Sequence, residues 1–183
     1  MTFIIVLIIF ALLLWAAIVF NRLVTLRNRA AEAWADIDVQ LKRRYDLIPN
    51  LVATVKAYAE HESQVFENVT QARAAAMGAE TLADKGQAEA TLAGALKSVF
   101  AVGEAYPDLK ANQNFLTLQN ELTDIEDKIQ ASRRFYNGNV RDLNTAIQKF
   151  PGNLIAGPLH FLPMDLFQLE ATAPAKEPVQ VKF

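Results

Sequence analysis

The pattern of apolar and polar positions divides the chain into an uncharged apolar stretch, a long helical region and an end rich in proline and glycine. The stretch from Phe3 to Phe20 has 18 residues, and 14 of them are Leu, Ile, Phe or Val. In a helix, about 18 residues span roughly 27 Å, close to the hydrocarbon thickness of a bilayer. Insertion into lipid is favoured by roughly 4–8 kcal/mol. Residues 1–21 are therefore predicted to form a transmembrane anchor, with Phe3, Phe10, Trp15 and Phe20 as its aromatic anchoring residues.

The residues around this stretch favour a retained anchor over a cleaved signal peptide. No basic residue precedes Phe3, and the end of the stretch lacks the small-x-small pattern of a cleavage site. Arg22, Arg27 and Arg29 follow directly and are predicted to set the topology, because basic residues stay on the cytoplasmic side of a span. Since no second apolar run of membrane length occurs, we expect a single-pass protein with its N-terminus outside and its C-terminal domain in the cytoplasm.

The last part of the helical region carries the clearest periodicity. Apolar positions recur there at steps of three and four residues. The stripe that they form then shifts by one residue, as expected when a straight helix of 3.6 residues per turn is compared with a seven-residue repeat. This pattern predicts a helix over about residues 108–149, although Asn137-Gly138 is a turn dipeptide that could break or kink it. The predicted inward positions are Phe115, Leu118, Leu122, Ile125, Ile129, Ser132, Tyr136, Val140, Leu143, Ile147 and Phe150.

Two earlier stripes flank Pro49. The first contains Trp34, Ile37, Leu41 and Ile48, and the second begins at Leu51. Proline is tolerated at the first position of a helix but disrupts a helix interior. We favour a tight connection at residues 46–48, with Pro49 opening a second helix that runs to about residue 77. A single long helix kinked at Pro49 is the alternative.

A third, Ala-rich helix is predicted over about residues 81–103, after a C-cap at Gly78. Four helices with short connections pack most simply as an antiparallel up-and-down bundle. The predicted fold is therefore all-α, with the anchor followed by a four-helix bundle over residues 22–150. Residues 151–183 form a separate Pro- and Gly-rich apolar segment, which ends in a disordered tail beyond Glu170.

Two groups of residues are candidate interaction surfaces. Lys42, Arg43 and Arg44 form the densest positive charge in the chain, which suits an acidic partner or anionic lipid, although a solvated helix surface balanced by nearby aspartates is favoured. The apolar part of residues 151–170 must bury against the bundle, the membrane face or a partner. Phe161, Leu166 and Phe167 are its candidate contact residues.

Composition excludes several classes of function. The net charge of −2 gives no bulk basic field for nucleic acid, and the absence of cysteine removes disulfides, thiolate metal sites and cysteine nucleophiles. His61 lacks the second histidine that a zincin helix has four residues on, because residue 65 is Val. The carboxylates of residues 121–127 spread around the outer face of a helix. We therefore expect no enzyme, no cofactor and no metal site.

Several blocks, in order along the chain, strongly resemble the bacterial LemA family. They are Ala33-Trp34, Ile37 to Val52, Tyr58 to Glu62, Ala105 to Asn112, Leu118-Gln119 with Glu121-Leu122, Arg133 to Asn137, Phe150 to Asn153, and Val179 to Phe183. The resemblance implies a bacterial inner-membrane protein with one N-terminal span and a cytoplasmic antiparallel four-helix domain. It supplies no catalytic residues, and it links relatives with membrane organisation, including the formation of magnetosome membranes in one branch. Gly138 departs from the helix former expected at its position.

These observations lead to a non-enzymatic, membrane-tethered helical module that serves as a scaffold or adapter for protein partners or for membrane organisation. The alternative is an accessory subunit of a membrane enzyme such as a quality-control peptidase. The bilayer is the expected partner, protein partners are not identified, and a homo-oligomer is left open.

The predicted orientation is testable because the chain has no cysteine of its own. In intact cells, a cysteine introduced at Thr2 should react with a membrane-impermeant maleimide, whereas a cysteine introduced at Asn50 should react only after lysis. The opposite labelling pattern would show that the N-terminus lies in the cytoplasm and would contradict the predicted orientation. A shortened soluble product recovered from wild-type cells would exclude a retained anchor.

Overall fold

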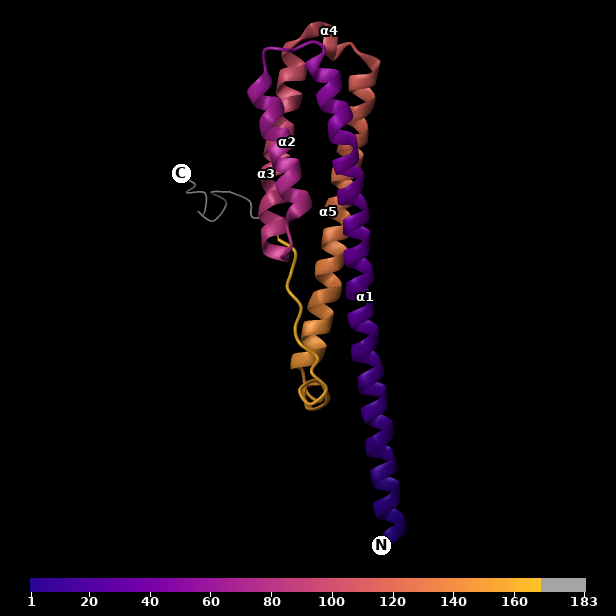
Figure 1. Cartoon of the computed structure of the whole chain (residues 1–183). Helices are drawn as coiled ribbons and strands as arrows, with labels where there is room; N and C mark the ends of the chain where they lie inside the picture. Colours follow the sequence, from indigo (N-terminus) through magenta and orange to yellow (C-terminus); the bar gives the residue numbers. More distant parts are fainter. Residues whose placement is uncertain (169–183) are drawn as a thin grey trace, which may run out of the picture. The chain divides into compact units, whose positions relative to one another are not determined.

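The computed structural model describes residues 1–168, and within this range it contains helices and no strand (Figure 1). The helices are α1 (Thr2–Lys56), α2 (Ser63–Gly78), α3 (Leu82–Ala105), α4 (Pro107–Lys110), α5 (Gln113–Gln148) and α6 (Asn153–Ala156). The predicted all-α class and the long apolar N-terminal helix are therefore confirmed. The predicted disordered tail beyond Glu170 lies outside the described residues.

The chain divides into two compact units. Within the described residues, unit 1 comprises residues 1–41 and 126–166, and unit 2 comprises residues 42–125 and 167–168. Helices α1 and α5 each contribute one segment to both units. The antiparallel four-helix bundle over residues 22–150 stays a prediction, because those residues are divided between the units.

Helix α1 passes through Pro49 without ending, so the favoured prediction of a turn at residues 46–48 was wrong. A proline inside a helix removes the N–H that would bond to the carbonyl four residues earlier, at a cost of about 3 kcal/mol. That carbonyl belongs to Tyr45, and the Nε of Arg73 on α2 donates to it at 2.8 Å. Arg73 thus supplies the donor that Pro49 lacks, and the helix continues to Lys56.

The chain turns instead at residues 57–62, between α1 and α2. The side-chain nitrogen of Asn112 donates to the hydroxyl of Tyr58, which lies in this turn, at 2.8 Å. The side-chain oxygen of Asn112 accepts from the backbone N–H groups of Asn114 and Phe115 at 2.9 and 3.2 Å. One asparagine therefore holds the turn and caps the N-terminus of α5.

The helix predicted over about residues 108–149 is confirmed, but it begins later, at Gln113. Residues 107–110 form the separate helix α4, and α5 then runs through Asn137-Gly138 without a break. Phe150 departs from the predicted stripe: it follows the end of α5 and is 73% exposed. The buried members of the predicted stripe are Phe115, Leu122, Ile125, Ile129, Tyr136, Val140, Leu143 and Ile147.

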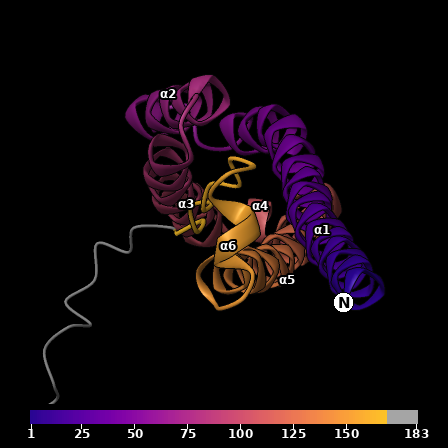
Figure 2. The same ribbon diagram turned by 90° about the horizontal axis from the view of Figure 1, so that it is seen from below.

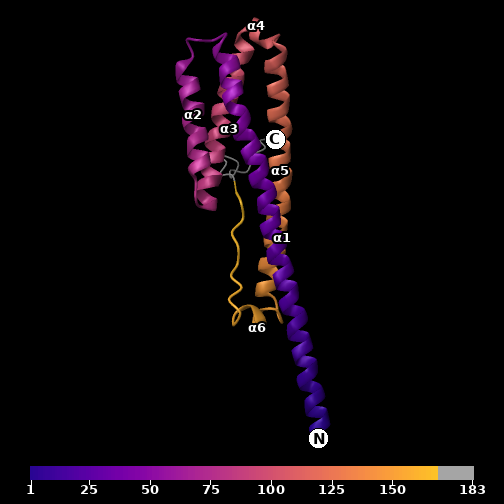
Figure 3. The same cartoon turned by 45° about the vertical axis from the view of Figure 1, so that its right-hand side comes forward.

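In unit 2, close approaches at glycine bring the elements together. Helices α2 and α3 lie side by side (Figures 1 and 3). The buried ring of Phe115 on α5 occupies the space where a Cβ of Gly103 on α3 would lie. The backbone of Gln168 passes Gly86 so closely that a Cβ there would clash with its carbonyl oxygen. These two glycines therefore permit contacts that a larger residue would block.

A buried ionic group links α1 to α3 inside unit 2. Arg44 and Glu89 are 3% and 1% exposed, and the guanidinium of Arg44 forms an ion pair with the carboxylate of Glu89. The hydroxyl of Tyr45 donates to the other carboxylate oxygen of Glu89. The prediction that Arg44 belongs to an exposed basic surface was therefore wrong, because its charge is neutralised in the interior.

Replacing one partner of the Arg44–Glu89 pair should lower the free energy of unfolding more than replacing both partners. The Glu89→Leu substitution leaves the charge of Arg44 buried and should lower the free energy of unfolding by about 3–5 kcal/mol. The Arg44→Met/Glu89→Leu double variant should recover most of that loss, because no uncompensated charge remains. Denaturation of the detergent-solubilised protein followed by circular dichroism measures both.

The matched control is Glu104→Leu, at an exposed position of the same helix α3. Surface substitutions usually change stability by less than about 0.5 kcal/mol. Equal losses in the Glu89→Leu and Glu104→Leu variants would contradict a structural role for the buried pair.

Candidate membrane-interface site

The first part of α1 is an apolar surface that the other residues within 1–168 leave exposed. It contains an 18-residue window with a mean hydropathy of 3.3, and none of this window is buried. Phe3, Phe10 and Phe20 are exposed, and Trp15 is half-buried. Within unit 1, this part of α1 projects past α6 (Figure 3). The helix is long and apolar enough to cross a membrane, which indicates a membrane protein.

A small apolar core forms where the apolar part of α1 ends. The ring of Phe161 meets the ring of Phe20 edge-on, with 5.9 Å between the ring centroids. The guanidinium carbon of Arg27 lies 5.3 Å from the centroid of the Phe161 ring, which is a cation–π contact. Arg27 therefore contributes to packing in addition to its predicted role in topology. The buried residues of this core are Leu23, Leu143, Ile147, Ala156 and Phe161.

A left-handed residue returns the chain toward α1 after α6. His160 has a φ of 54°, a conformation that few residues other than glycine adopt. It allows the N–H of Phe161 to donate to the carbonyl of Ala156 at 3.0 Å. This turn closes the short helix α6 and directs the Phe161 ring into the apolar core.

Two polar side chains of α5 hold the extended segment that follows Phe161. The amide of Asn144 donates to the carbonyl of Met164 at 2.8 Å and accepts from its N–H at 2.9 Å. The hydroxyl of the buried Tyr136 donates to the carbonyl of Asp165 at 3.0 Å. Burial raises the pKa of Tyr136 above 10.0, and the negative charge of Asp165 raises it further. These bonds supply partners for backbone groups outside any helix.

Exposed apolar residues lie on α6 and on both sides of it in sequence, and α6 lies at the end of α5 (Figures 2 and 3). Phe150 and Leu162 are 73% and 75% exposed, and Leu154 and Leu159 are also exposed. Contiguous apolar surface on a protein usually marks a contact with a partner or a membrane. Because Phe161 lies between these residues in sequence and packs on Phe20, the segment is tied to the end of the apolar stretch of α1.

The residues predicted as interaction surfaces differ in how far they are exposed. Phe161 is 7% exposed and Phe167 is fully buried, so the prediction was wrong for both, as it was for Arg44. Both rings pack against other residues of this chain, because burial removes the large apolar area of an aromatic ring from water. Leu166 is 39% exposed. Lys42 and Arg43 are exposed on α1, and their role as a contact surface stays a prediction.

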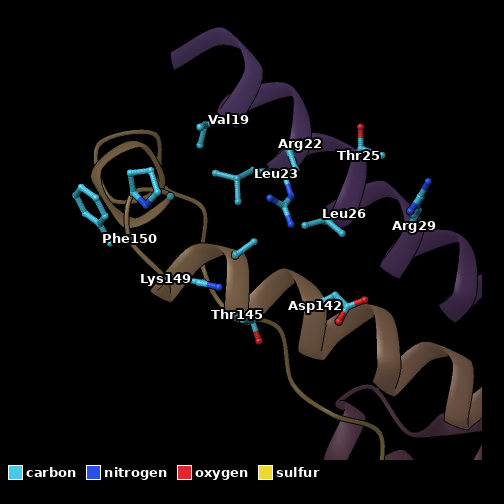
Figure 4. Close-up of a pocket in the computed structure, with 13 residues that line it drawn as sticks. Val19, Arg22, Leu23, Thr25, Leu26, Arg29, Asp142, Thr145, Lys149 and Phe150 are labelled. Atoms are coloured by element: carbon cyan, nitrogen blue, oxygen red, sulfur yellow. The ribbon is translucent and has the colours of Figure 1, made fainter. Parts of the chain in front are cut away.

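A cavity of about 750 Å³ opens between the segments of α1 and α5 that belong to unit 1 (Figure 4). Val19, Leu23 and Leu26 of α1 supply apolar walls. The side chain of Arg22 points from α1 into the space facing α5 (Figure 4). The remaining lining residues are Thr25, Arg29, Asp142, Thr145, Ala146, Lys149, Phe150, Pro151 and Gly152.

The histidines and carboxylates stay apart within the described range. His61 is exposed in the turn between α1 and α2, and His160 is exposed after α6. Among residues 1–168, no three His, Asp or Glu side chains gather in a group that could hold a metal ion. The absence of a catalytic role stays a prediction.

Residues 1–168 place this chain among helical proteins whose first helix contains an apolar stretch long enough to span a membrane. The LemA family model matches residues 33–183. The chain therefore belongs to the LemA family.

Curated relatives are similar over most of this chain. Magnetosome protein MamQ of Magnetospirillum gryphiswaldense is 24% identical over 163 residues, which cover 75% of this chain and 60% of MamQ. Protein LemA of Metamycoplasma hominis is 28% identical over 153 residues, which cover 81% of this chain and 68% of the relative. Magnetosome protein MamQ 2 of Paramagnetospirillum magneticum is 25% identical over 175 residues, covering 81% of this chain and 64% of that protein. The chain thus spans less than two thirds of the length of the MamQ proteins.

The Tyr136→Phe substitution tests how the extended segment is held. Loss of the hydroxyl removes the bond to Asp165 and should lower the free energy of unfolding by about 1 kcal/mol near pH 7. A raised pKa in the folded protein means that the stability due to Tyr136 is fully present below pH 10 and falls as the pH rises through the folded value. The difference between wild type and variant should therefore shrink above pH 10, as measured by thermal unfolding in detergent. A difference that is constant with pH would contradict this assignment.

Proposed function

We propose that this LemA-family chain is a membrane-anchored helical module that serves as a scaffold or adapter, either for protein partners or for membrane organisation, and that catalyses no reaction itself. The bacterial inner membrane is its proposed location, with the N-terminus outside and the helical domain in the cytoplasm. Arg22, Arg27 and Arg29, directly after the apolar stretch, support that orientation.

The observation that carries the proposal is the continuity of α1. Helix α1 contains the exposed apolar stretch and continues to Lys56. Its residues beyond the apolar stretch include many that are buried in the core. Ile37, Leu41, Ile48 and Leu51 on this helix are fully or almost fully buried. An anchor and a folded domain that share one helix suit a protein that presents a surface at the membrane.

Exposed side chains on the helices supply surface for partners. Val39 on α1 is 50% exposed, and Lys42 and Arg43 follow it on the same helix. Three relatives are named as magnetosome proteins, which supports a role in membrane organisation. The accessory-subunit alternative differs in predicting that a neighbouring enzyme changes its turnover when this chain is deleted.

Charge reversal at Lys42 and Arg43 tests the adapter role. A Lys42→Glu/Arg43→Glu variant, extracted in mild detergent after crosslinking in intact cells, should lose defined partners that the wild-type chain retains, by about tenfold in yield. The expected cause is the loss of two favourable charge contacts and the gain of two repulsive ones.

The matched control is the Arg134→Glu/Arg141→Glu variant, which makes the same charge change at two exposed positions of α5. It should retain the partners captured by wild type. A wild-type chain that stays monomeric and without partners after crosslinking would contradict the proposal. A change in the turnover of a captured membrane enzyme on deletion would favour the accessory-subunit alternative.

A further inference from the structure

We propose that the cavity between α1 and α5 of unit 1 binds the headgroup of one anionic phospholipid. The inference rests on the membrane anchor of the proposed function and does not depend on any protein partner.

The position of the cavity along α1 argues for lipid. Val19 belongs to the apolar stretch and lines the cavity, and Arg22 follows it by less than one turn. From Phe20 to Arg22 the helix rises by about 3 Å, so Arg22 lies at the depth of the headgroups if the apolar stretch fills the hydrocarbon. The cavity therefore opens at the boundary where lipid phosphates lie.

The charges of the lining select an anion. Arg22 and Arg29 of α1 and Lys149 after α5 supply three cations, and Asp142 supplies one carboxylate. Within residues 1–168 none of these four groups forms an ion pair. Three exposed cations around one cavity leave a positive site that a phosphate diester would neutralise, because guanidinium groups bind phosphate oxygens with paired hydrogen bonds.

The apolar lining distinguishes a lipid from a free phosphate. Val19 of the apolar stretch and Phe150 after α5 offer no hydrogen bond and suit the upper part of an acyl chain, which a free phosphate lacks. The cavity volume of about 750 Å³ is within the range of roughly 300–1,000 Å³ that is usual for ligand sites. The combination of cationic and apolar walls suits a molecule with an anionic head and an apolar body.

The test uses the full-length protein purified in mild detergent and supplied with phosphatidylglycerol or phosphatidylcholine. Native mass spectrometry should show one phosphatidylglycerol bound per chain, with at least tenfold higher affinity than phosphatidylcholine. An Arg22→Gln/Lys149→Gln variant should lose affinity for phosphatidylglycerol by about 25-fold, since each cation near a lipid phosphate contributes about fivefold. An Asp142→Asn variant should bind more tightly, because the repulsive carboxylate is removed.

The matched control is the Arg134→Gln/Arg141→Gln variant, which removes two exposed cations of α5 that do not line the cavity. Its affinity should stay within about twofold of wild type. Equal binding of the two lipids, or an equal loss in the control variant, would overturn the proposal. Displacement of phosphatidylglycerol by millimolar glycerol 1-phosphate or inorganic phosphate would also overturn it in favour of a soluble phosphate site.

If the Arg22→Gln/Lys149→Gln variant fails to fold, the Asp142→Asn variant still tests whether the cavity binds phosphatidylglycerol. A folded variant that binds phosphatidylglycerol more tightly supports the site, because misfolding does not increase affinity. Unchanged or weaker binding by that variant counts against it. All binding is measured on the purified chain, so a failure of the adapter role leaves this result unaffected.

Discussion

The apolar first part of α1, which the other residues within 1–168 leave exposed, limits where this chain can fold and remain stable. In water, each Å² of such a surface costs about 25 cal/mol, whereas a bilayer removes that cost and requires only that the backbone bonds be satisfied within the helix. The window with a mean hydropathy of 3.3 meets both conditions. At its end the chain becomes amphipathic: Phe161 packs on Phe20 and under Arg27, and exposed apolar residues lie on α6 and on both sides of it in sequence. This is the order of side chains expected across a membrane boundary.

Beyond the apolar stretch, the fold depends on partners for backbone and charged groups that a helix alone does not satisfy. Arg73 donates to the carbonyl that Pro49 leaves without a donor. Asn144 bonds to both backbone groups of Met164, as a neighbouring strand would. Glu89 neutralises Arg44 where both are buried. In each case a single side chain removes the cost of an unsatisfied group in the interior.

The helices of this protein could be predicted where the apolar period is continuous. The stripe from Phe115 to Ile147 identifies α5, and the uncharged run from Phe3 identifies the apolar stretch. The start of α5 was misplaced because Asn112 caps it, and a cap in a polar segment gives a weaker signal than an apolar stripe. Pro49 was misjudged because its compensating donor lies 28 residues from Tyr45 in sequence. The cavity residues were only partly recognised: Arg22 and Arg29 were identified for topology, whereas Lys149 and Asp142 gave no signal of their own.

The helical class, the apolar stretch and its basic flank follow from the order of residues alone, because composition and local periods of three and four residues specify them. Three outcomes required the folded chain: Arg44, Phe161 and Phe167 are buried, α1 continues to Lys56, and Arg22 and Lys149 line one cavity. Each of those outcomes depends on residues distant in sequence. The free energy of a buried charge, of a carbonyl without a backbone donor or of an aromatic ring depends on the residues that contact it in the folded chain.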